Sequence, residues 1–95
     1  MATGLVRARV IWHGEVQGVN FRYHTREDSD RFRVSGFVQN LPDSTVLTVA
    51  EGEKTEVEHF IQAIEGTMGS RTEITGKDVV WEPATGEFRS FEIRR

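Results

Sequence analysis

Residues 5–25 are LVRARVIWHGEVQGVNFRYHT, and the spacing of the apolar residues changes within this stretch. From Leu5 to His13 apolar residues alternate with polar ones, which is typical of a strand with one buried face. A glycine-bearing loop follows over residues 14–20. From Phe21 onward the apolar positions recur at helical rather than strand spacing. The stretch therefore predicts a strand, a loop and a first helix in succession.

Two further strands and a second helix are predicted in the middle of the chain. Alternation at Val34, Gly36 and Val38 indicates a strand that ends at Gln39-Asn40, and residues 41–44 (LPDS) have turn chemistry. Strand character resumes over residues 45–51, so the two runs form a hairpin. A helical stripe follows at Val57, Phe60, Ile61 and Ile64; Thr55 and Glu58 form a capping-box pattern before it, and Gly66 is expected to end the helix.

The last part of the chain predicts a fourth strand over residues 74–82 and a short extra strand around Phe91 and Ile93. The order is then strand, helix, strand, strand, helix, strand, with one terminal strand added. This is the α+β ferredoxin-like βαββαβ sandwich, in which two helices cover one face of a mostly antiparallel sheet. The first helix is expected to carry Phe21, Thr25 and Phe32 on one face.

The topology brings separated residues together. A right-handed crossover makes the first and second strands parallel, so their carboxyl ends share one edge of the sheet. If the third strand lies between them, these ends are about 10 Å apart. The loop over residues 14–20, Arg22 and Asn40 can therefore meet.

Composition limits the classes of protein. The chain has 95 residues, of which 37% are hydrophobic, so we expect a single globular domain over residues 1–95. It has no cysteine, which excludes disulfides and a cysteine nucleophile and is compatible with the cytoplasm. The longest apolar runs are three residues, which predicts no membrane span. A net charge of -3 argues against nucleic acid as a partner.

The loop and the helix that follows it are candidates for an anion site. Gly14 and Gly18 let the backbone N–H groups turn inward, and a helix N-terminus favours negative charge. Arg22 lies in the first turn, where the helix dipole disfavours a cation by a few tenths of a kcal/mol or more. A bound oxyanion would compensate it. The alternatives are an ordinary connecting loop and an arginine that faces Glu15 or pairs with Glu27.

Asn40 stands where a strand passes into a turn. Asparagine is common there for its conformational tolerance, which is the alternative interpretation. Beside an anion site, its amide could instead hold a water molecule in line with a phosphorus atom. His24 and Asp28 are spaced four residues apart, but two groups do not make a metal site, so no metal is expected.

Two segments carry a resemblance to a known family. Residues 14–22 (GEVQGVNFR) match the acylphosphatase signature G-x-V-Q-G-V-x-F-R at every specified position. Residues 36–40 (GFVQN), followed by Asp43, Val46 and Gly52, resemble the second signature of that family. The resemblance extends from about Val6 to Ile93.

The resemblance implies the acylphosphatase sandwich and hydrolysis of the carboxyl-phosphate bond of small acyl phosphates. It implies that Arg22 binds the phosphoryl group and that Asn40 positions the attacking water. No cofactor is implied, inorganic phosphate is expected as product and competitive inhibitor, and a monomer is expected. The amides of the phosphate-binding loop would be those of Glu15, Val16, Gln17, Gly18 and Val19.

Two other functions stay open. One is a non-enzymatic module that binds phosphate or another anion at the same loop. The second is a module like the N-terminal domain of hydrogenase-maturation carbamoyltransferases, against which the lack of zinc-finger cysteines argues. The chain also departs from the acylphosphatase pattern. Ser44 and Arg33 replace usual glycines, so a strained or differently shaped hairpin is expected, and a left-handed conformation at Arg33 is expected to cost about 1 kcal/mol or more of stability. Segment 67–77 lacks the expected proline.

Overall fold

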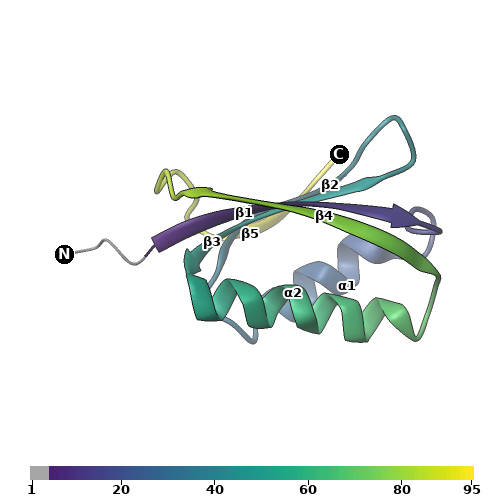
Figure 1. The fold of residues 1–95 in the computed structure, drawn as a ribbon, viewed down its shortest axis with the longest axis horizontal. Helices are drawn as coiled ribbons and strands as arrows, with labels where there is room; N and C mark the ends of the chain where they lie inside the picture. Colours follow the sequence, from purple (N-terminus) through teal and green to yellow (C-terminus); the bar gives the residue numbers. More distant parts are fainter. Residues whose placement is uncertain (1–4) are drawn as a thin grey trace.

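The structure, a computed structural model, describes residues 5–95 and contains a five-stranded sheet with two helices against one face (Figure 1). The element order agrees with the prediction, including the extra C-terminal strand; the first four residues of the predicted domain lie outside the described range. The elements are β1 (Leu5–Gly14), α1 (Phe21–Ser29), β2 (Ser35–Asn40), β3 (Val46–Glu53), α2 (Lys54–Gly69), β4 (Ile74–Pro83) and β5 (Phe91–Arg94).

The order of strands across the sheet is β4-β1-β3-β2-β5. Strand β3 pairs antiparallel with both β1 and β2, so β1 and β2 are parallel to each other, as predicted. Val46 of β3 lies opposite Trp12 on one side and Asn40 on the other. The ends of β1 and β2 therefore lie at the same edge, separated by one strand. In Figure 1 the loop after β1 and the β2–β3 hairpin lie at the same end of the molecule.

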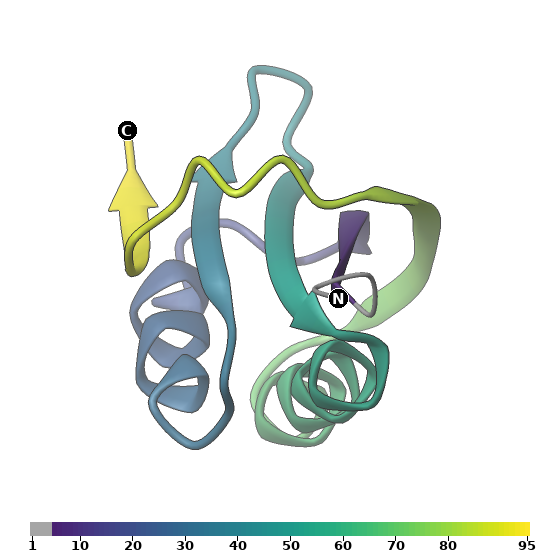
Figure 2. The same ribbon diagram turned by 90° about the vertical axis from the view of Figure 1, so that its left-hand side faces the viewer.

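The core lies between the sheet and the two helices, which Figure 2 shows on the same side of the strands. Alternation in β1 turns Ala8, Val10 and Trp12 inward, where they are fully buried. The Trp12 ring packs against Phe21, the first residue of α1, with ring centroids 5.7 Å apart. This contact fixes where α1 begins. The predicted stripe on α2 is buried as well.

Both ends of α2 differ from the prediction. The helix begins at Lys54, with Glu53 as N-cap and no side-chain cap bond, so the capping box at Thr55 and Glu58 is not formed. Strand β3 runs directly into α2 and leaves no room for that cap. The helix also continues through Gly66 to Gly69, because Met68 extends the buried stripe by one turn beyond Ile64. Only four residues then connect α2 to β4 within segment 67–77.

The end of α1 also differs from the prediction. The helix ends at Ser29, so Phe32 lies beyond it and packs on Phe60 with ring centroids 6.1 Å apart. Arg33 is not in the left-handed region, where the non-glycine residues among those described are Asn20 and Ser44. Its backbone N–H donates to Glu56 Oε1 at 2.8 Å. The turn after α1 therefore needs no left-handed residue at Arg33.

The β2–β3 hairpin has a strained residue, as expected. Leu41 and Thr45 flank the turn, with the Leu41 N–H donating to the Thr45 carbonyl at 2.9 Å. Between them, Ser44 has φ of 75°, and its N–H donates to the Leu41 carbonyl at 3.2 Å. A type I turn closed by a left-handed residue is a common three-residue hairpin loop, and it favours glycine at that last position.

We expect Ser44→Gly to raise the free energy of unfolding by about 0.5 to 1 kcal/mol. Relief of the left-handed strain is worth roughly 1–2 kcal/mol, and the larger entropy of glycine in the unfolded chain removes part of the gain. Urea unfolding measures the change. Ser70→Gly is the matched control, since Ser70 has φ of -87° and gains nothing from glycine. If Ser44→Gly fails to raise the free energy of unfolding, or if Ser70→Gly raises it as much, the strain at Ser44 is contradicted.

The buried carboxylate of Glu51 connects the 84–90 segment to the face of the sheet opposite the helices. Glu51 is 5% exposed and accepts hydrogen bonds from Arg7 Nε (2.9 Å), Thr85 N (2.9 Å) and Gly86 N (3.0 Å). Burial alone would raise the pKa of Glu51, but the hydrogen bonds from Thr85, Gly86 and Arg7 outweigh it and lower the pKa overall. The folded protein therefore favours the ionised form of Glu51.

This network predicts a loss of stability in acid. Because the folded-state pKa of Glu51 lies below the unfolded one, its stabilisation is complete above the ordinary glutamate pKa of about 4.3 and is lost as the pH falls through the folded-state pKa. We expect Glu51→Gln to cost about 1–3 kcal/mol at neutral pH and to flatten the acid limb of stability against pH. Urea unfolding across pH tests this, with exposed Glu92→Gln as control. Parallel acid limbs for wild type and Glu51→Gln would contradict it.

No helix within residues 5–95 has the length and apolar character to cross a membrane.

Candidate active site

A small cavity lies where the loop after β1, the start of α1 and the end of β2 converge. Its volume is about 80 Å³. The predicted meeting of the 14–20 loop, Arg22 and Asn40 is therefore observed. The residues that line it are Val16, Gly18, Asn20, Phe21, Arg22, Tyr23 and Asn40.

The start of the loop is attached to the connection between α2 and β4. The Glu15 N–H donates to the Glu73 carbonyl at 2.8 Å, and Thr72 Oγ1 donates to the Glu15 carbonyl. Gly14 makes this approach possible, because its φ is 119° and a Cβ there would lie 2.3 Å from the Glu73 carbonyl oxygen. Val16, 1% exposed, then inserts its side chain into the core. The loop thus has a fixed base.

The backbone amides of residues 16–19 differ from that of Glu15 in their hydrogen bonding. Within residues 5–95, none of the N–H groups of residues 16–19 donates a hydrogen bond to another residue. Gly18 has φ of 80° and Asn20, the N-cap of α1, has φ of 60°. Consecutive backbone N–H groups without hydrogen-bond acceptors, placed before a helix N-terminus, are suited to binding an anion. Glu15 is the exception to the predicted set, because its N–H already has a partner.

Arg22 follows the buried Phe21, so the packing of Phe21 on Trp12 places it at the first turn of α1. The first turn contains no acidic residue. Arg22 is half-buried, and its Nη1 donates to the Arg94 carbonyl at 3.2 Å. In the described part of the chain it forms no ion pair, so the alternatives of pairing with Glu15 or Glu27 are not observed. Its charge is available to an anion in the cavity.

Asn40 is the last residue of β2 and is half-buried at the cavity. Its backbone is held by pairing with Val46. Across residues 5–95 its side-chain amide has no hydrogen-bond partner, which leaves one acceptor and two donor hydrogens for a water or a ligand. The amide is therefore held at the cavity by a regular strand rather than by a flexible turn.

Sequence reasoning missed the side chain of Gln17. Its Nε2 donates to the carbonyls of Leu41 and Thr45, both at 2.8 Å. These bonds join the loop to the hairpin that follows Asn40. The partners are 24 and 28 positions away in sequence, and no local pattern signals such a pair.

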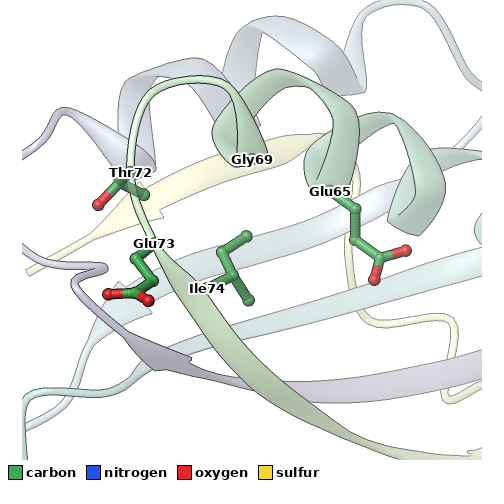
Figure 3. Close-up of a pocket in the computed structure, with 5 residues that line it drawn as sticks. All are labelled: Glu65, Gly69, Thr72, Glu73 and Ile74. Atoms are coloured by element: carbon green, nitrogen blue, oxygen red, sulfur yellow. The ribbon is translucent and has the colours of Figure 1, made fainter.

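A larger hollow, of about 560 Å³, lies elsewhere, between the end of α2 and the start of β4 (Figure 3). The carboxylates of Glu65 and Glu73 lie on it, and the ammonium of Lys77 is 2.6 Å from Glu65 Oε2. Its negative charge makes it unsuited to an anion. Within residues 5–95, no three His, Asp or Glu side chains are grouped as metal ligands would be.

Comparison with known families shows which family the chain belongs to. The sequence profile of the family described as acylphosphatase matches residues 8–93. The chain belongs to the acylphosphatase family. The match includes every residue that lines the cavity, so the cavity is a feature of the family region rather than of an added segment.

Individual relatives agree with this assignment. An acylphosphatase from Rubrobacter xylanophilus is 47% identical over 89 residues, which are 93% of this chain and 79% of the relative. The crystal structure of an acylphosphatase from Bacillus subtilis has a TM-score of 0.85 at 27% identity and covers 95% of this chain and 99% of its own. Full-length HypF in its phosphate- and nucleotide-bound form has a TM-score of 0.81 at 31% identity, over 95% of this chain and 12% of that chain. The chain is thus a hydrolase of the acylphosphatase type with a ferredoxin-like α/β fold.

Proposed function

We propose that the chain hydrolyses the carboxyl-phosphate bond of an acyl phosphate in the cavity formed by the 14–20 loop, Arg22 and Asn40. One observation carries the proposal: unbonded loop amides, an arginine without an ion pair and an asparagine without a hydrogen bond converge on one small cavity. Donors that no other part of the protein uses and that face one cavity are available to bind a ligand there.

The phosphoryl oxygens bind to positive groups in this mechanism. The guanidinium of Arg22 offers a planar pair of donors that fits two phosphoryl oxygens. The amides of residues 16–19 and the N-terminus of α1 supply further donors. We leave the Glu15 amide out of this cradle, because its N–H is bonded to Glu73. Charge that develops on the phosphoryl group in the transition state is stabilised by groups already in position.

Asn40 orients the attacking water. Its side-chain carbonyl accepts a hydrogen bond from the water and thereby directs the oxygen lone pair toward phosphorus. The water oxygen forms a new bond to phosphorus, and the bond from phosphorus to the carboxylate oxygen breaks. The carboxylate leaves with the electron pair, and the water proton passes to solvent or phosphate. A carboxylate is a good leaving group, so no protein nucleophile is required, and we assign no general base.

A non-enzymatic anion-binding module would use the same cradle but would have no need of a water-positioning amide. Hydrolysis of a panel of acyl phosphates, such as benzoyl and acetyl phosphate, with a chelator present separates the two functions. We expect turnover that the chelator does not reduce. Tight phosphate binding without turnover would favour the binding module. All the site residues come from one chain, so we also propose that the monomer is active.

Inorganic phosphate is expected to inhibit competitively, because it fits the same cradle as the substrate. In an NMR titration the amide signals of residues 16–19 should shift on phosphate addition, whereas that of Glu15, already hydrogen-bonded, should shift less. Steady-state kinetics gives the mode of inhibition. Non-competitive inhibition, or shifts centred on the hollow between Glu65 and Glu73, would show that the cradle has been wrongly placed.

A further inference from the structure

The loop over residues 14–20 is attached to the rest of the protein at two points, one before the unbonded amides and one among them. At its start, Glu15 is bonded to Thr72 and Glu73. In its middle, the Gln17 side chain donates to the carbonyls of Leu41 and Thr45 in the β2–β3 hairpin. The second attachment uses both hydrogens of one NH2 group, so its direction as well as its length is fixed.

The two acceptors of Gln17 are the residues that close the hairpin. The Leu41 carbonyl also accepts from the Ser44 N–H, and the Thr45 carbonyl also accepts from the Leu41 N–H. Each carbonyl thus uses two lone pairs, one for the turn and one for Gln17. Leu41 directly follows Asn40 in the chain. A single side chain therefore joins the backbone of the cradle to the backbone beside Asn40.

We propose that the Gln17 side chain is a positioning residue that sets the distance between the phosphate cradle and the water held by Asn40. The inference rests on the proposed function of that cavity. The loop binds the phosphoryl group, and the end of β2 holds the water. The loop and the end of β2 belong to separate parts of the sheet edge. Their alignment depends on a direct connection between them, and Gln17 supplies it.

The chemistry of the contact requires an uncharged amide of this length. Asparagine is shorter by one methylene, leucine cannot donate, and an ionised glutamate presents only acceptors to two carbonyl oxygens. Loss of Gln17 leaves both carbonyls with their backbone donors. No buried group is orphaned, so Gln17→Leu and Gln17→Asn are expected to fold.

We expect Gln17→Leu and Gln17→Asn to lower kcat for benzoyl phosphate by about tenfold or more, while the Kd for inorganic phosphate changes by less than about threefold. The cradle still binds the anion, because Glu15 and Val16 hold the loop, but the water is no longer aligned with phosphorus.

Gln62→Leu is the matched control, since Gln62 is an exposed glutamine on α2. Ile61→Ala, a destabilised core variant away from the cavity, controls for stability and should keep its kcat well below its melting temperature.

Gln17→Glu gives a signature in the pH profile. Once protonated, the glutamic acid O–H can donate to one of the two carbonyls, so the ratio of variant to wild-type kcat should rise as the pH falls through the titration of this carboxyl. The same ratio for Gln17→Leu should stay flat. If Gln17→Leu keeps kcat within twofold of wild type, or if its kcat and phosphate affinity fall together, the positioning role is overturned.

The inference can fail separately from the proposed function. If the wild type hydrolyses no acyl phosphate, the proposed function fails, and phosphate binding followed by NMR then decides the role of Gln17. Phosphate saturation should shift the side-chain NH2 signals of Asn40 in wild type and Gln62→Leu, but much less in Gln17→Leu. An equal shift in all three proteins would overturn the connection.

Discussion

Arg22→Ala is expected to lower the rate of benzoyl phosphate hydrolysis by roughly two to four decades, equivalent to about 3–5 kcal/mol of transition-state stabilisation. Arg22 is the one cation among the residues that line the cavity, and it forms no ion pair in the described part of the chain. The loss should appear in phosphate affinity as well as in kcat. Arg22→Lys should recover little, because an ammonium cannot match two phosphoryl oxygens at once.

The control for Arg22 lies one turn further along α1. Arg26 is half-buried and its Nη1 is 2.7 Å from Asp30 Oδ1, so it has a carboxylate partner and does not line the cavity. Arg26→Ala should keep nearly full activity. Circular dichroism and urea unfolding establish that both variants fold. An Arg22→Ala protein that folds and retains more than about a tenth of wild-type activity would eliminate the phosphate-binding role.

Asn40→Ala is expected to lower kcat by about a hundredfold or more and to leave phosphate affinity almost unchanged. The reason is that Asn40 holds only the water, whereas the cradle holds the phosphoryl group. Asn40→Asp should be at least as harmful, since it keeps the shape of the side chain but places negative charge beside the phosphoryl oxygens. Steady-state kinetics combined with phosphate titration measures the two effects.

Gln39→Ala is the control for Asn40, since Gln39 is the preceding residue of β2 and its side chain bonds to the Arg95 carbonyl rather than lining the cavity. It should retain activity. If Asn40→Ala instead weakens phosphate binding strongly and leaves the maximal rate intact, Asn40 is a binding or turn residue. The water-positioning mechanism would then be abandoned.

The parts of the fold that follow local patterns could be predicted from the sequence. Alternation in β1 and the helical stripe of α2 arise because each element buries one face, and this burial is encoded within a few residues. The ends of α2 could not be predicted in the same way. A glycine at position 66 is a stop signal only when no buried contact lies beyond it, and Met68 provides one.

In the candidate site, too, some contacts could be predicted from the sequence and others could not. The meeting of Arg22 and Asn40 could be predicted because the handedness of one crossover and one intervening strand determine it. The hydrogen bond from the Glu15 backbone N–H and the hydrogen bonds from the Gln17 side chain could not be predicted. They depend on how far a loop or a side chain reaches across the folded molecule, and their partners are encoded tens of residues away.

The attachment of Glu15 to Thr72, 57 positions later, has a consequence for folding kinetics. During synthesis the entire signature segment is complete once Arg22 has been added, but the base of the loop has no partner until Thr72 and Glu73 follow. Contacts of such high sequence separation form late, because the loop-closure entropy must be paid first. In a refolding experiment, affinity for phosphate should therefore appear together with the pairing of β1 and β4, not with the early formation of α1.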